Sequence, residues 1–271
     1  TDKSKAYPGG YFIARRLPYA IVCQRNGTMA IFFANTTAPV SKGSTYTPEG
    51  TAEDWTVVDF WAGEDDLVKR TGIGLFREGE LSRSTWSSYG SSVRKAVFES
   101  SFQTVKPKNL SMWFYRFEGM ETIEGIENLN TSEATDMSGM FFRCSDIIKI
   151  DFSNFDSHYI SNTCKLFYDC SSLEELILTN FNTHNVDKMA HMFEGCKSLI
   201  NLDLSSFDTS NVTDMNHMFY FCNSLTNLNL GNFDIHNVND NSYMFSECNS
   251  LDKKNIITTD KDNEILKLFN N

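Results

Sequence analysis

A chain of 271 residues is long enough for one elongated domain or for two small ones. Hydrophobic residues make up 41% of it and aromatic residues 13%, so an intrinsically disordered chain is not expected. The net charge of −11 would repel the phosphates of nucleic acids and anionic lipid headgroups, which argues against both as partners. No apolar run reaches the roughly 18 residues of a membrane-spanning helix, so no membrane span is expected. The chain begins with Thr rather than Met, from which we expect that an upstream signal segment was removed.

Residues 1–92 predict a small β-rich N-terminal cap domain that covers the first coil of the repeat described below. Two β-rich runs within residues 19–34 flank Asn26-Gly27, the strongest short signal for a hairpin with a type I′ turn. Residues 45–47 and 55–60 are further strand-like runs. Residues 61–92 are rich in Gly and Ser and are expected to form a loop or a variable insertion.

Residues 93–251 contain an internal repeat. Its clearest unit, residues 196–222, follows the pattern C-x2-L-x2-L-x-L-x2-F-x4-V-x2-M-x2-MF-x2-C. Apolar residues recur in this way from starts at positions 93, 120, 147, 173, 199, 225 and 251, with a spacing of 26 or 27 residues. Such a period is typical of a solenoid, because one coil cannot bury its own apolar face and stacked coils can. We expect five full coils, with a partial coil at each end.

Each coil carries two local signals. Residues 202–204 alternate with period two, which predicts a short strand. Met215, Met218, Phe219 and Cys222 are spaced i, i+3, i+4 and i+7, which predicts a helix of about two turns, with Asp214 as its cap. The predicted fold is therefore an α/β solenoid of right-handed, leucine-rich-repeat-like coils, each a short parallel strand plus a short helix.

The strands are expected to centre near Ile123, Ile150, Leu176, Leu202 and Leu228. Residues 252–271 are expected to form a C-terminal cap, in which residues 264–269 are a short amphipathic helix over the last coil.

The repeats resemble the BspA-like leucine-rich repeats of bacterial surface proteins. The resemblance rests on NVTDM at residues 211–215, HMF at 217–219 and CNSLTNLNL at 222–230, and on the lead-in at 113–115 and 123–126. It implies a protein that is secreted or attached to the cell surface and that adheres to host or neighbouring-cell proteins. We further expect a monomer whose ligand is a protein or glycan, for example a host extracellular-matrix protein. No catalytic residues come with the family, and neither an enzyme nor a cofactor is expected.

Several columns of repeated residues carry side chains that could form chemical sites. The cysteine column (Cys144, Cys170, Cys196, Cys222 and Cys248) is expected to be buried and reduced, because zinc ligands usually lie close together in sequence. Cys164 is expected to be the more exposed thiol. His191 and His217 should be neighbours, and His158, His184 and His236 form a second column, both interpreted as surface decoration rather than metal ligands. Asp156, Asn182, Asp208 and Asp234 form a column that is interpreted as turn residues, with calcium binding as the alternative.

Side chains that alternate with the core leucines must point away from the core, so the strand face is the predicted ligand surface. Its chemistry changes from coil to coil, and Ile177 would be an exposed apolar anchor for a partner. The predicted ligand-binding residues are Lys149, Asp151, Glu175, Ile177, Asn201, Asp203, Asn227 and Asn229.

The sequence leaves three functions open. The leading hypothesis is a binding protein for a protein or glycan ligand. The second is a structural spacer that displays another module, and the third is a hydrolase with its site within residues 1–92.

Overall fold

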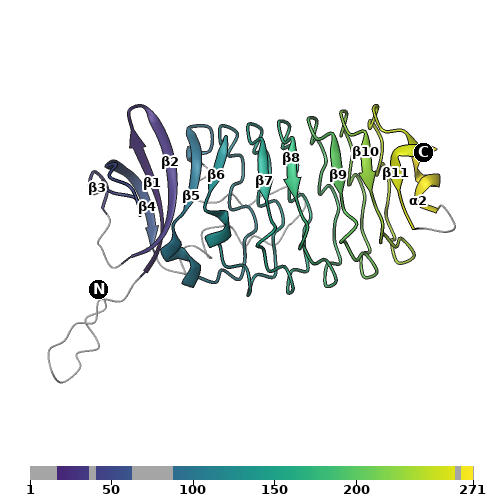
Figure 1. Ribbon diagram of the computed structural model, residues 1–271, viewed down its shortest axis with the longest axis horizontal. Coiled ribbons are helices and arrows are strands. Elements are labelled where there is room, and N and C mark those ends of the chain that lie inside the picture. The colour runs from purple at the N-terminus through teal and green to yellow at the C-terminus, as the bar shows by residue number, and fades with distance from the viewer. Residues whose placement is uncertain (1–16, 37–40, 63–87, 260–263, 271) are drawn as a thin grey trace, which may run out of the picture.

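A computed structural model describes residues 17–36, 41–62, 88–259 and 264–270. Most of the loop expected over residues 61–92, residues 63–87, lies outside the described residues. Figure 1 shows an elongated molecule in which the strands β5 to β11 follow one another along the long axis. An antiparallel hairpin stands at the N-terminal end of this row and a short helix at the C-terminal end. In the described part of the chain, no helix is long and apolar enough to cross a bilayer.

The N-terminal strands form the predicted hairpin. Strands β1 (Leu17–Arg25) and β2 (Thr28–Thr36) pair in antiparallel fashion across Asn26 and Gly27, whose φ angles are 49° and 80°. A type I′ turn requires positive φ at both of these positions, so the prediction from Asn-Gly is confirmed. Two more strands extend the sheet on the outer side, β4 (Trp55–Ala62) against β1 and β3 (Thr45–Tyr46) against β4.

The same sheet continues into the repeats. Strand β5 (Val93–Phe98) pairs in parallel with β2, and β6 (Thr122–Glu124) pairs in parallel with β5. Phe33 of β2 stacks on Phe98, with ring centroids 4.5 Å apart, and on Trp113 at 5.5 Å. The hairpin therefore covers the first coil through both backbone pairing and aromatic packing, and the sheet runs without a break past residue 92.

The short strands of the coils lie where the leucine pattern places them. After β6 they are β7 (Lys149–Asp151), β8 (Glu175–Ile177), β9 (Asn201–Asp203), β10 (Asn227–Asn229) and β11 (Ile256–Ile257). The five predicted strand centres are thus confirmed. Pairing is parallel and in register within β7–β8 and within β9–β10–β11, but the ladder is interrupted between β6 and β7 and between β8 and β9.

The predicted α/β fold class is wrong, because no coil contains an α-helix. The described residues are mostly strands and turns, and their one α-helix is α2 (Glu264–Lys267), beyond the coils. Short 3-10 helices occur at Ser100–Thr104, Ile126–Asn128, Lys253–Asn255 and Leu268–Asn270. The segment from Met215 to Cys222, expected to be helical, is a succession of turns. Strand-plus-helix coils are therefore not what this chain forms.

Backbone hydrogen bonds explain the error. The amides of Met215, His217 and Phe219 donate to carbonyls of the following coil, over 2.8–3.0 Å, and not to the residue four positions earlier as in a helix. His217 also has a φ of 54°, a left-handed conformation that a right-handed helix excludes. Asp214 accepts the amide of Asn216 at 3.1 Å, so it closes a local turn rather than capping a helix.

The side-chain pattern nevertheless predicted burial correctly. Met215, Met218, Phe219 and Cys222 are all fully buried. The i, i+3, i+4, i+7 spacing indicates which side chains face the core. A helix places side chains at this spacing on one side, and so does a series of turns in which two residues four positions apart are left-handed.

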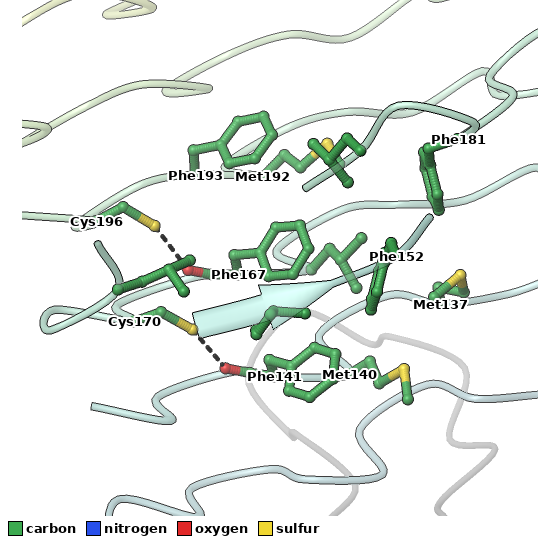
Figure 2. Packing of buried hydrophobic residues seen from close by; sticks show 14 of the residues in the cluster. Met137, Met140, Phe141, Phe152, Phe167, Cys170, Phe181, Met192, Phe193 and Cys196 are labelled. Carbon is green, nitrogen blue, oxygen red and sulfur yellow. Dashed lines mark hydrogen bonds between the residues drawn. The ribbon is translucent and has the colours of Figure 1, made fainter. Parts of the chain in front are cut away.

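The cysteine column is confirmed as a column of buried free thiols. Figure 2 shows the thiols of Cys170 and Cys196 directed at the carbonyl oxygens of Phe141 and Phe167, over 3.1 and 3.2 Å. The Phe rings stack beside them, with centroids of Phe141 and Phe167 5.9 Å apart. Cys164 is half-buried and therefore more exposed than the cysteines of the column, as predicted.

A column of buried hydroxyl groups, not anticipated from the sequence, also ties neighbouring coils together. The hydroxyl of Thr209 donates to the carbonyl of Asp234 (2.9 Å) and accepts the amide of the same residue (2.7 Å). Thr183 makes the same two bonds to Asp208, each 2.8 Å long. Thr183 and Thr209 are both fully buried. Each hydroxyl thus replaces a pair of backbone hydrogen bonds at a point where the strand ladder has ended.

The last coil is covered as predicted for residues 264–269. Ile265 of α2 is fully buried, and Phe269 packs its ring 5.3 Å from that of Phe245. The apolar side of this short helix therefore closes the C-terminal end of the core.

Candidate binding surfaces

The predicted strand-face residues all lie on strands β7 to β10. Lys149, Glu175, Asn201, Asp203 and Asn227 are exposed, whereas Asp151, Ile177 and Asn229 are half-buried. Ile177 is therefore not the exposed apolar anchor that was expected.

Most polar groups of the strand face are already engaged with one another or with the backbone. Lys149 and Glu175 form an ion pair of 2.7 Å across β7 and β8, and Asn227 donates to Asn201 over 2.7 Å. The side chains of Asp151, Asp203 and Asn229 each accept the amide two residues further on, over 2.9–3.1 Å. These last three side chains end their strands, so part of the predicted site has a structural role.

A second surface is formed by the turns on which the helix prediction was based. We call it the turn face and define it by residues 165–169, 191–195, 217–221 and 243–247. A continuous row of aromatic and histidine rings starts at two buried residues of the preceding coils and runs along this face, with neighbouring centroids 4.6 to 6.3 Å apart. Its order is Tyr115, Phe142, Tyr168, His191, His217 and Tyr243. The predicted adjacency of His191 and His217 is confirmed, since their rings stack with centroids 4.8 Å apart.

The turn face contains a hollow of about 410 Å³. Its lining comes from three successive coils and consists of Tyr168, Asp169, Glu194, Gly195, Lys197, Tyr220, Phe221 and Asn223. The volume lies within the range of about 300–1,000 Å³ that is typical of small-molecule sites. We call this feature the Gly195 hollow.

Gly195 creates the space because the same turn position carries a side chain in the neighbouring coils, Asp169 before it and Phe221 after it. All three residues have positive φ, and that of Gly195 is 75°. A Cβ on Gly195 would lie 3.0 Å from the carboxylate Oδ1 of Asp169, so even a methyl group would press against a residue that lines the hollow. The sequence contained a signal for this feature, a single glycine at a repeat position that carries a side chain in the other coils. The pattern of apolar residues does not include this position.

The carboxylates at the hollow are already partnered. Glu194 is 2.5 Å from Nδ1 of His191. Burial raises the pKa of Tyr168, and the charge of Glu194 adds to this effect. Asp169 lies 3.5 Å from Nε of Arg143. Burial lowers the pKa of His217, and the neighbouring His191 lowers it further.

The Asp/Asn column serves as turn structure. Oδ1 of Asp156, Asn182, Asp208 and Asp234 accepts the amide two residues further on, over 2.8–3.1 Å. At Asp208, hydrogen bonds from the Ser210 hydroxyl, His184 and the Ser210 amide lower the pKa to about 2. The described residues contain no cluster of three or more His, Cys, Asp or Glu side chains arranged for a metal ion.

The family model described as "Mycoplasma protein of unknown function, DUF285" matches residues 88–178 and again residues 146–259. The two overlapping matches cover more than half of the chain. The chain belongs to the DUF285 family. In this DUF285 protein the matched region begins just before β5 and ends just after β11, so it contains the coils and the Gly195 hollow. Comparisons with curated proteins and with solved structures find no match.

Proposed function

We propose that this DUF285 protein is a non-catalytic binding protein that is secreted or attached to the outer cell surface. It acts as an adhesin for host or neighbouring-cell molecules, and the turn face is its contact surface. The Gly195 hollow carries the proposal, because it combines aromatic walls with polar side chains that neighbouring residues hold in place.

The turn face is well suited to recognition because its geometry is set by backbone contacts between coils. Parallel bridges join Asn109, Asp136, Asn162, Lys188, Asp214 and Asp240 in one continuous series. Each bridge fixes the turns that follow it relative to those of the next coil. The backbone of such a surface is ordered before a ligand arrives, which lowers the entropic cost of binding.

The resemblance to BspA-like surface repeats and the acidic character of the chain also support the proposal. A net charge of −11 disfavours nucleic acid and anionic lipid as the target. It leaves proteins and glycans as the ligand classes.

Solid-phase binding tests the proposal. The purified protein is titrated onto immobilised extracellular-matrix extract, onto intact cultured cells and onto albumin as the negative surface. We expect saturable binding to the extract or to cells, weakened by Phe221→Asn on the turn face and unchanged by Asn227→Lys on the exposed strand face. Binding that is absent from every surface would contradict an adhesin.

A structural spacer is the competing function. The continuous series of bridges favours a spacer because such a series stiffens the stack of coils. A spacer needs no ligand. It therefore predicts that variants of both faces leave attachment and surface display unaltered.

A further inference from the structure

We propose that the Gly195 hollow binds an uncharged sugar residue of a glycan. This proposal rests on the proposed binding function and narrows its ligand to one chemical class. It assigns recognition to side chains outside the predicted strand face.

The walls of the hollow present aromatic surface. Phe221 is 38% exposed, and Tyr220 lies beside it with ring centroids 4.4 Å apart at a steep angle of 72°. Tyr168 contributes a third ring from the coil on the other side of Gly195. The face of an aromatic ring is negative, and the C–H edge of a pyranose ring is weakly positive, so a sugar packs favourably against such a wall.

The polar lining supplies both hydrogen-bond acceptors and donors. Asp169 and Glu194 accept, whereas Lys197 and Asn223 donate. Adjacent sugar hydroxyls need such a mixture, since each hydroxyl both donates and accepts. A site for an anion would need cationic groups in excess, and the hollow has one lysine against two carboxylates.

A cationic side chain of a partner protein fits less well than a neutral sugar. Asp169 lies 3.5 Å from Nε of Arg143, whose positive charge offsets its own, and Glu194 is in contact with Nδ1 of His191 at 2.5 Å. Lys197 in the same lining would repel an incoming lysine or arginine. The carboxylates therefore remain hydrogen-bond acceptors but offer little net attraction to a cation.

Gly195 makes the proposal testable without removing a core residue. In Gly195→Asn, the new Cβ would lie 3.0 Å from Oδ1 of Asp169, so we expect the side chain to crowd the lining of the hollow. Asn tolerates the left-handed backbone of this position better than most residues. The matched control is Gly50→Asn, because Gly50 also has positive φ (76°) and nothing lies within 4 Å of its added Cβ.

A second pair of variants probes the aromatic wall. Phe221→Asn removes a ring at a left-handed position. Arg116→Asn introduces the same residue at the equivalent left-handed position of an earlier coil, outside the hollow, and removes no ring. Each variant is first compared with the unaltered protein by circular dichroism and thermal unfolding, so that misfolded protein is not scored as loss of binding.

The experiment applies the full chain to an immobilised set of oligosaccharides with neutral galactose, mannose or N-acetylglucosamine termini, and to sialylated and sulfated counterparts. Lysine-rich and arginine-rich peptides are spotted beside them. We expect neutral termini to be retained in preference to their anionic counterparts. Loss of one aromatic contact should weaken retention by about tenfold. Phe221→Asn should show this weakening, Gly195→Asn should abolish retention, and Gly50→Asn and Arg116→Asn should leave it unchanged.

Other results would overturn the inference in distinguishable ways. Equal sugar binding by the unaltered protein and by Gly195→Asn would place the sugar elsewhere. Retention of the basic peptides in place of sugars, sensitive to Phe221→Asn, would make the hollow a cation site. Saturable binding to matrix proteins with no sugar retained would refute the glycan ligand and leave the proposed binding function standing.

Discussion

Thr209→Val should destabilise the fold far more than the loss of one surface hydroxyl would suggest. Valine keeps the shape of threonine but cannot bond the amide and the carbonyl of Asp234, which the Thr209 hydroxyl now reaches over 2.7 and 2.9 Å. Thr209 is fully buried and Asp234 half-buried, so water replaces the two bonds only in part. Each buried polar group left without a partner costs about 1–3 kcal/mol. Taking the lower end for both groups gives a loss of about 2 kcal/mol in the free energy of unfolding.

Thermal unfolding and hydrogen exchange measure the effect. For a chain of this size, a loss of about 2 kcal/mol corresponds to a fall in Tm of roughly 4–8 °C. The amide of Asp234 should also lose its protection from exchange. Thr213→Val is the matched control. Thr213 is exposed in the same coil, and its hydroxyl makes one hydrogen bond, 3.2 Å to the carbonyl of Asp187. Loss of this bond should lower the free energy of unfolding by at most about 0.5 kcal/mol. If both variants unfold at the same temperature and Asp234 stays protected, the hydroxyl column does not join the coils as we describe.

Two further predictions concern titratable groups. Burial raises the pKa of Cys164 to about 11 and raises that of Cys196 well above its ordinary value. Iodoacetamide applied to the native protein at pH 8 should therefore label Cys164 before Cys196. Mass spectrometry that shows the reverse order would argue against the buried column. Asp208 has a folded pKa of about 2, below its ordinary value of 3.8, so it stabilises the fold above about pH 4 and this contribution is lost as the pH falls toward 2. The urea midpoint of Asp208→Asn should therefore fall less steeply over this pH window than that of the unaltered protein, and parallel pH profiles would count against the assigned hydrogen bonds.

The sequence determined the repeat, the strand positions and the membership of the core. Leu202 and Leu228 lie opposite each other in adjacent strands, as the 26-residue period requires, and the cysteines lie in one buried column. These features depend on which side chains avoid water, and apolar spacing reports that directly. The Asn26-Gly27 hairpin was also predictable, because its turn depends only on the local backbone preferences of those residues.

Tertiary structure alone decided the backbone of the second half of each coil and the location of the hollow. A helix satisfies its amides within its own segment, whereas His217 donates to a carbonyl one coil away, and no local pattern identifies such a partner. The same holds for the candidate site. Tyr168, Gly195 and Phe221 are far apart along the chain. They line one hollow only because the coils stack in register and because Gly195 has no side chain at a position where the neighbouring coils have one. Local spacing determines burial, and the partners supplied by neighbouring coils determine both the conformation and the surface available to a ligand.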